Sequence, residues 1–187
     1  MDQTEMKIAA ARAALDEVRD GMRLGLGTGS TAAEFVRLLG GARFRDLRCT
    51  CTSQKTEELA HSLGMATFKL ADLAPLDLAV DGADAIDDQL RLIKGGGGAL
   101  LREKIVEQAA ARFIVIADES KVVATFSGHR LPVEVTRFAK DVLERRFADQ
   151  GLQPVLRIRD GQTRITDEGN MILDVRVPDD QDIADVA

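Results

Sequence analysis

The chain has 187 residues, of which 45% are hydrophobic and 30% are charged, and its formal net charge is −6. This composition is typical of a soluble globular protein that forms one domain, or one domain and a smaller appendage. The acidic balance disfavours nucleic acid or an anionic membrane as the main partner, because neither gains from an acidic surface.

Alternating helices and strands are predicted for the first 128 residues. Apolar spacing and turn residues indicate strands at 22–26, 46–50, 65–70, 76–80 and 113–117, and helices at 4–19, 31–39 and 54–64. Ser53 is the expected N-cap of the third helix, and Gly40 and Gly41 are expected to end the second. This order predicts an α/β fold with a mostly parallel, Rossmann-like sheet covered by helices on both faces.

From residue 129 the pattern becomes α+β. A short strand at 131–135 precedes a charged amphipathic helix that ends at Gly151. Short strands follow within 152–175, joined by Asp-Gly and Glu-Gly turns. We therefore predict an α/β catalytic domain over 1–128 and a small α+β domain over 129–187.

The sequence offers little for a membrane segment or a metal centre. No apolar run approaches the roughly 20 residues that span a bilayer, and the amino terminus lacks the layout of a secretory signal. Cys49 and Cys51, the only cysteines, would point to one face of a strand. We interpret them as buried thiols of a reduced cytoplasmic protein, and a metal or redox C-x-C pair is the alternative.

A glycine- and hydroxyl-rich turn, GLGTGSTA, connects the first predicted strand to a helix at 25–32. It fails as a dinucleotide fingerprint because Ser30 occupies the third glycine position, and no Gly-Lys-Ser/Thr follows to make a P-loop. Backbone N–H groups and hydroxyls at a helix N-terminus favour phosphate binding. The alternative is a tight turn capped by Ser30 or Thr31.

The stretch 81–107 holds the strongest candidates for catalysis. Asp81 and Asp84 follow an apolar strand, and Lys94 precedes four glycines at 95–98. α/β enzymes display polar groups at strand ends, and glycines there favour close approach to a ligand over a flexible linker. Asp87 and Asp88 are interpreted as parts of a solvated loop.

Two further charged residues each allow two interpretations. Glu103 lies among apolar neighbours on a predicted helix, where partial desolvation would raise its pKa and suit a general base. The alternative is a surface charge. Lys121, after a buried strand, is either a surface lysine or an anion ligand.

Several segments together resemble type A ribose-5-phosphate isomerase, in family order and spacing: GMRLGLGTGSTAAEFV, TSQKTEELA, DLAVDGAD, KGGGGALLREK, FIVIADESK, LPVEV and GNMILDV. The resemblance implies interconversion of ribose 5-phosphate and ribulose 5-phosphate through an enediolate, without metal or cofactor. It also implies a sugar phosphate as the small-molecule partner, a cytoplasmic location, and a homodimer or higher homo-oligomer.

Matching positions carry the family's roles to this chain. Glu103 would be the base, and Lys94 would stabilise the oxyanion beside the backbone N–H groups of Gly95 to Gly97. Asp81 and Asp84 would open the sugar ring and bind hydroxyls. The implied substrate-binding residues are Lys7, Thr28, Gly29, Ser30, Thr31, Asp81, Gly82, Ala83, Asp84, Lys94, Gly95, Gly96, Gly97 and Lys121, with Ser30, Thr31, Lys121 and Lys7 nearest the phosphate.

The resemblance has one departure. Similar family members continue beyond the IADVA segment through a helix and two strands, so the small domain is expected to be C-terminally shortened, with an unpaired strand edge. A shortened isomerase without activity and a sugar-phosphate sensor without turnover are therefore the alternatives. A nucleotide-dependent oxidoreductase or kinase is disfavoured, because both nucleotide motifs fail.

Overall fold

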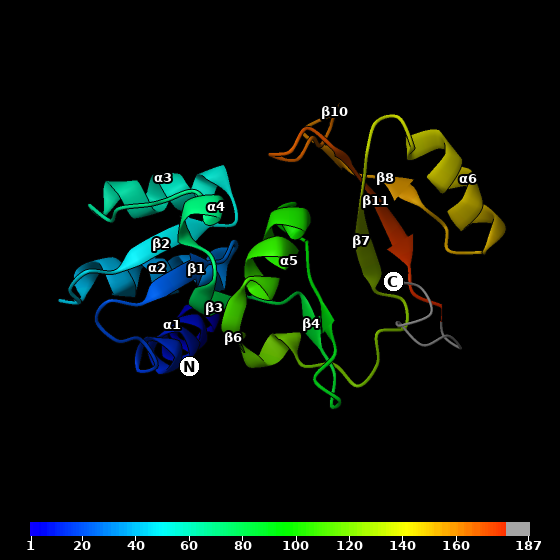
Figure 1. Ribbon diagram of the computed structural model, residues 1–187. Helices are drawn as coiled ribbons and strands as arrows, with labels where there is room; N and C mark the ends of the chain where they lie inside the picture. Colours follow the sequence, from blue (N-terminus) through cyan, green and yellow to red (C-terminus); the bar gives the residue numbers. More distant parts are fainter. Residues whose placement is uncertain (179–187) are drawn as a thin grey trace. The chain divides into compact units, whose positions relative to one another are not determined.

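The computed structural model describes residues 1–178, and Figure 1 labels most of their helices and strands. The chain divides into two compact units. Unit 1 is Met1–Ala83 with Leu101–Lys121, and unit 2 is Asp84–Leu100 with Val122–Ala187. Residues 84–100 and 122–128, which precede the predicted boundary at 128/129, group with the C-terminal part. The last nine residues of the predicted small domain, 179–187, lie outside the described residues.

Unit 1 is built on a parallel sheet in the order β2-β1-β3-β6. Its strands are β1 (Arg23–Leu26), β2 (Arg48–Cys51), β3 (Leu76–Asp81) and β6 (Ala110–Val115). Its helices are α1 (Gln3–Leu15), α2 (Ser30–Gly41), α3 (Gln54–Ser62), α4 (Leu70–Leu73) and α5 (Leu100–Gln108), followed by a short 3-10 turn, Glu119–Lys121. The predicted α/β fold with a parallel sheet is confirmed.

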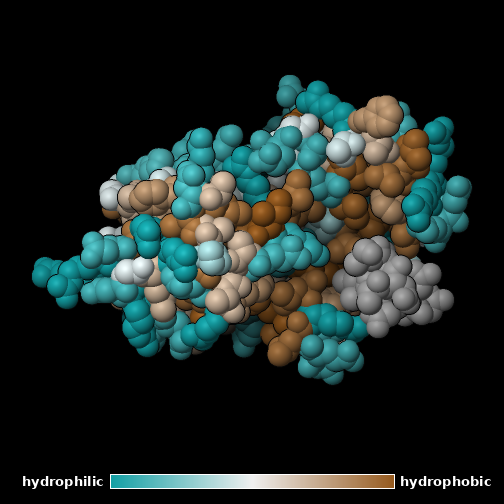
Figure 2. Space-filling model, in the orientation of Figure 1, coloured by the Kyte–Doolittle hydropathy of each residue, from teal (hydrophilic) through white to brown (hydrophobic). Residues whose placement is uncertain are grey.

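Both faces of the sheet are buried at its central strands β1 and β3. Leu24 and Leu26 of β1 lie in the main core with α1 and α2, for example with Phe35. Gly25 lies between these two residues and therefore points to the opposite face of the sheet, which α5 covers. An added Cβ on Gly25 would lie only 2.5 Å from Val106 Cγ1. Glycine at this position therefore lets α5 pack directly on the sheet. The outer side over α3 is mostly hydrophilic in Figure 2.

One local prediction in unit 1 is wrong. The strand expected at 65–70 is a single parallel bridge between Cys49 and Thr67, after which the chain forms α4. The reason is packing, because α4 buries Leu73 against Leu76 and Val106. The second helix ends at Gly40 and Gly41 as expected, since they are its last two residues.

The two cysteines lie on β2. Cys49 is part of the main core and Cys51 packs against it, and both are free thiols. Burial raises the pKa of each thiol to about 12. Since the thiolate is the nucleophile, we expect neither to react appreciably with iodoacetamide at about pH 8 in the folded protein, and both to react after denaturation. Intact mass measures this, and rapid alkylation of the native chain would contradict the burial.

Unit 2 contains a three-stranded antiparallel sheet in the order β7-β11-β8, with helix α6 (Lys140–Asp149) next in sequence after β7. Its strands are β7 (Arg130–Val135), β8 (Val155–Leu156) and β11 (Met171–Arg176), with the hairpins β4 (Ala85–Ile86)–β5 (Leu92–Ile93) and β9 (Ile158–Arg159)–β10 (Gln162–Thr163). Ala85 and Ile93 share a buried cluster with Phe126 and Val177. This cluster explains why residues 84–100 belong to unit 2.

The expectation that Asp87 belongs to a solvated loop is wrong, because this residue is only 3% exposed. Its carboxylate accepts hydrogen bonds from the backbone N–H groups of Gln89 and Arg91, and from Arg91 Nε at 2.7 Å. Burial raises the pKa of Asp87, but the bonds from Arg91 outweigh it, so the pKa lies below its ordinary value. Asp87 therefore closes the β4–β5 turn, while Asp88 is exposed as expected.

None of the helices within residues 1–178 has the length and apolar character that crossing a membrane requires.

Candidate active site

Asp81 connects the ends of two neighbouring strands in unit 1. It is the last residue of β3 and is 1% exposed. Its Oδ1 accepts hydrogen bonds from the backbone N–H of Thr28 (3.0 Å) and of Gly82 (2.7 Å). An added Cβ on Gly27 would lie 2.1 Å from the same oxygen. The predicted carboxylate and the predicted glycine-hydroxyl turn therefore meet at the carboxyl ends of adjacent parallel strands.

Thr28 is held by a buried cluster of hydroxyl groups. Its Oγ1 lies 2.7 Å from Thr52 Oγ1 and donates to Ser53 Oγ at 2.8 Å. Thr56 Oγ1 lies 3.2 Å from Thr28 Oγ1 and donates to the carbonyl of Gly27 at 2.9 Å. The predicted N-cap role of Ser53 is confirmed, since its Oγ accepts from Thr56 N–H. The positioning of Thr28 by these residues was missed, although TSQKT directly follows β2.

The start of α2 excludes one alternative for the turn. The N-cap is Gly29, with φ of 118°, and within the described residues no side chain caps this end of the helix. Ser30 and Thr31 are the first two helical residues instead, so capping does not explain their hydroxyls. Gly29 and Ser30 are exposed. An exposed helix N-terminus with hydroxyls is suited to an anion.

Glu103 is buried, with 3% exposure, so the surface alternative is excluded. One carboxylate oxygen each of Asp81, Glu103 and Glu107 lies within 4.8 Å of the others. Glu103 and Glu107 are one helical turn apart on α5 and so share a face. The same spacing could also hold a cation. Glu107 was missed, although its i, i+4 spacing from Glu103 is visible in the sequence.

The positive charges of Lys7 and Lys121 both interact with the carboxylate of Asp118, which is 3% exposed. Ser120 donates to Asp118 through both its hydroxyl and its N–H. These bonds, chiefly the one from the hydroxyl, lower the pKa of Asp118, and the charges of Lys7 and Lys121 add to the effect. The two lysines expected near the phosphate thus lie near one carboxylate. Asp118 was missed, although it stands in the FIVIADESK segment.

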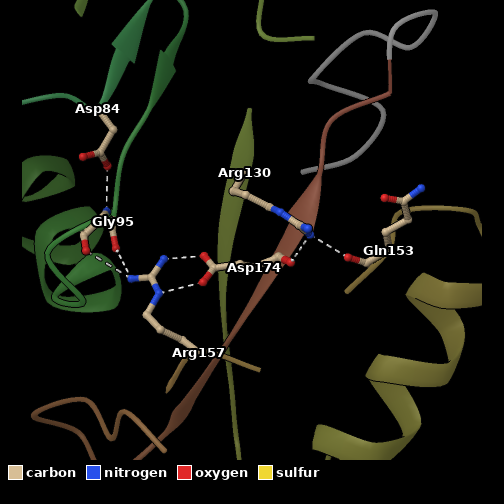
Figure 3. Close-up of polar contacts among 7 residues, drawn as sticks. Asp84, Gly95, Arg130, Gln153, Arg157 and Asp174 are labelled. Carbon is tan, nitrogen blue, oxygen red and sulfur yellow. Dashed lines mark hydrogen bonds and ion pairs between the residues drawn. The ribbon is translucent and has the colours of Figure 1, made fainter. Parts of the chain in front are cut away.

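The glycine segment Gly95–Gly98, called the glycine loop below, is an ordered turn of unit 2. Gly98 N–H donates to the carbonyl of Gly95 at 3.0 Å, and both residues have positive φ. Asp84, whose N–H donates to the carbonyl of Ile93, accepts from Gly96 N–H at 2.6 Å. Figure 3 shows this contact. The linker alternative is therefore excluded, and Gly96 N–H, expected to face an oxyanion, is bound to Asp84 in this structure.

The predicted residues fall into two groups, one in each unit. Unit 1 holds Lys7, Thr28, Gly29, Ser30, Thr31, Asp81, Gly82, Ala83, Glu103 and Lys121, and unit 2 holds Asp84, Lys94, Gly95, Gly96 and Gly97. Ala83 and Asp84 are consecutive, so a single peptide bond joins the groups there.

Comparison with known proteins identifies a family. The family model described as ribose 5-phosphate isomerase A (phosphoriboisomerase A) matches residues 48–187. A curated relative, ribose-5-phosphate isomerase A of Agrobacterium fabrum, is 49% identical over 196 residues, covering 98% of this chain and 84% of the relative.

Solved structures agree with this assignment. Ribose 5 phosphate isomerase A from Neisseria gonorrhoeae is similar with a TM-score of 0.90 and 38% identity, over 97% of this chain and 80% of that one. A D-ribose-5-phosphate isomerase in complex with phospho-erythronic acid gives a TM-score of 0.93 and 37% identity, over 100% and 84%. The resemblance seen in the sequence motifs is confirmed, and the chain belongs to the ribose 5-phosphate isomerase A family.

Proposed function

We propose that this chain interconverts D-ribose 5-phosphate and D-ribulose 5-phosphate by proton transfer through an enediolate. Family membership supports the reaction class. The structural observation that carries the proposal is the buried carboxylate of Glu103, held close to Asp81 and Glu107 beside the carboxyl end of the parallel sheet. A carboxylate kept out of water at the end of a parallel sheet is suited to act as a general base that removes a proton from carbon.

Glu103 would take the proton from C2 of the open-chain aldose. The electrons of the C2–H bond then form the C1=C2 double bond, and O1 becomes the enediolate oxygen. The protonated Glu103 returns a proton to C1 while the proton of O2 moves to O1, so that C2 becomes the ketone and C1 carries a hydroxyl. Lys94 and the N–H groups of the glycine loop would stabilise the negative oxygen during these steps.

Ring opening and binding come before this chemistry. Asp81 and Asp84 would accept the anomeric hydroxyl proton, protonate the ring oxygen and then bind sugar hydroxyls. Asp81 also fixes the turn at Thr28 through its hydrogen bond to the backbone. Thr28, Gly29, Gly82 and Ala83 would line the sugar.

The phosphate would bind at the N-terminus of α2, with Ser30 and Thr31 as hydroxyl donors. Lys7 and Lys121, which both act on Asp118, would supply positive charge. Charge-assisted hydrogen bonds of this kind fix a phosphate strongly, so they would anchor the end of the substrate that does not react.

The three carboxylates also permit a competing arrangement in which a cation takes part. The direct test is the rate of ribulose 5-phosphate formation from ribose 5-phosphate after dialysis against EDTA. We expect the rate to be unchanged. Loss of activity restored by a divalent cation would assign Asp81, Glu103 and Glu107 as metal ligands, and absence of turnover by the folded chain would contradict the proposed function.

We further propose that the enzyme is a homodimer or higher homo-oligomer in the cytoplasm, without nucleic acid or membrane partners. Exposed apolar residues in unit 2 support self-association, since Phe138 is 99% exposed and Val142 on α6 is 59% exposed. Light scattering of the purified chain measures the oligomeric state, and a monomer at micromolar concentration would contradict this part of the proposal.

A further inference from the structure

Arg157 is rigidly fixed in unit 2, between β8 and β9. Its Nε donates to Asp174 Oδ2 at 2.8 Å and its Nη2 to Oδ1, which makes a bidentate pair with a residue of β11. The backbone is tied as well, because Arg157 N–H donates to the carbonyl of Ile172 and its carbonyl accepts from Arg164 N–H. Both side chains of the pair are less than one fifth exposed. The guanidinium therefore has little freedom to turn.

The remaining nitrogen of Arg157 is directed at the glycine loop. Nη1 donates to the carbonyl of Gly95 at 2.9 Å and to the carbonyl of Gly96 at 3.2 Å, as Figure 3 shows. On the opposite edge of the first of these peptides, Gly96 N–H donates to Asp84. One cation thus holds two consecutive peptide groups directly after Lys94.

The contact of Arg157 with the two carbonyls also determines where the N–H groups of the glycine loop point. In a trans peptide the N–H points away from the carbonyl, so fixing the carbonyls of Gly95 and Gly96 also fixes the N–H directions of Gly96 and Gly97. A charged donor on a carbonyl polarises the peptide and strengthens its N–H as a donor. Of these two N–H groups, Gly96 N–H donates to Asp84, and Gly97 N–H is the one assigned to the enediolate oxygen.

We propose that Arg157 is a positioning residue for the isomerisation, which orients and polarises the glycine loop so that Gly97 N–H stabilises the enediolate. The inference rests on the proposed function. Asp174 holds the guanidinium in place. A guanidinium is needed at this position because it donates to a carboxylate and to two backbone carbonyls at once. The single ammonium of a lysine cannot reproduce this arrangement.

Arg130 provides a matched control in the same unit. Its Nη1 also donates to two backbone carbonyls, those of Gln153 (2.7 Å) and Asp174 (3.1 Å). Neither carbonyl belongs to the glycine loop. Arg130→Met and Arg157→Met therefore remove the same residue type and the same number of bonds to backbone carbonyls, but only the second releases the loop.

The test compares steady-state kinetics of the unchanged chain with Arg157→Met, Arg157→Lys and Arg130→Met, after equal melting temperatures have established folding. We expect kcat to fall by about 100-fold in both Arg157 variants, as for a misplaced catalytic group, with KM changed by less than about 3-fold. Arg130→Met should stay within about 2-fold of the unchanged chain. Guanidine at a concentration that does not denature should restore part of the activity of Arg157→Ala.

Three outcomes would overturn the proposal. They are a kcat of Arg157→Lys equal to that of the unchanged chain, a loss in Arg130→Met as large as in Arg157→Met, or a loss that falls entirely on KM. Arg157→Lys keeps the test open if Arg157→Met fails to fold. Absence of turnover by the unchanged chain would remove the proposed function itself, which distinguishes the two failures.

Discussion

Replacing Glu103 by glutamine is expected to lower kcat for ribose 5-phosphate by about 1,000-fold, because general-base catalysis contributes on this scale and an amide cannot accept the proton. This corresponds to about 4 kcal/mol of activation free energy. Binding of ribose 5-phosphate should persist, since glutamine keeps the size of the side chain. The coupled formation of ribulose 5-phosphate gives kcat, and calorimetry gives the affinity.

Glu107→Gln is the matched control, one turn further along α5 and in the same carboxylate cluster. We expect it to reduce kcat by less than about 10-fold, because it removes a neighbouring charge and not the base. An equal loss in both variants, or an unchanged rate in Glu103→Gln, would remove Glu103 from the role of base.

Gly27→Ala is expected to lower the free energy of unfolding by about 3 kcal/mol, the upper range for overpacking a core, and to remove most activity. The new Cβ would lie 2.1 Å from Asp81 Oδ1 and 2.5 Å from Asp81 Cβ. Gly27 cannot withdraw easily, because its N–H donates to the carbonyl of Val80. Asp81 would have to move and lose its bond from Thr28 N–H.

Gly41→Ala is the control for this substitution. An added Cβ there meets no atom within 4 Å, and the residue is the last of helix α2. Alanine is the better helix former, so we expect stability to rise by up to about 1 kcal/mol with activity unchanged. Urea unfolding followed by circular dichroism measures both variants. A Gly27→Ala protein as stable as the unchanged chain would contradict the close approach of β1 and Asp81.

The parallel sheet was predictable because its determinants are local. Short apolar runs between glycines and helix caps gave β1, β2, β3 and β6, and the buried strands of a parallel sheet have this pattern. The meeting of Thr28 and Asp81 also follows, since both stand at strand ends that adjacent parallel strands bring to one edge.

The remainder depends on contacts between distant residues, which no local pattern encodes. Residues 84–100 group with unit 2 because Ala85 and Ile93 pack with Phe126 and Val177. Arg157 reaches Gly95 across 62 positions of the chain. Asp87 looked like one more loop carboxylate, and only the fold of the β4–β5 hairpin buries it against Arg91.

The most direct test of proton transfer by Glu103 is the reaction run in deuterium oxide with EDTA present, followed by NMR of the product. Transfer through an enediolate exposes the abstracted proton to exchange on the base, so ribulose 5-phosphate should carry deuterium at C1. Glu103→Gln should slow turnover and labelling together, by about 1,000-fold. Product that retains only protium at C1 while the unchanged chain turns over would indicate a direct hydrogen shift and contradict the account.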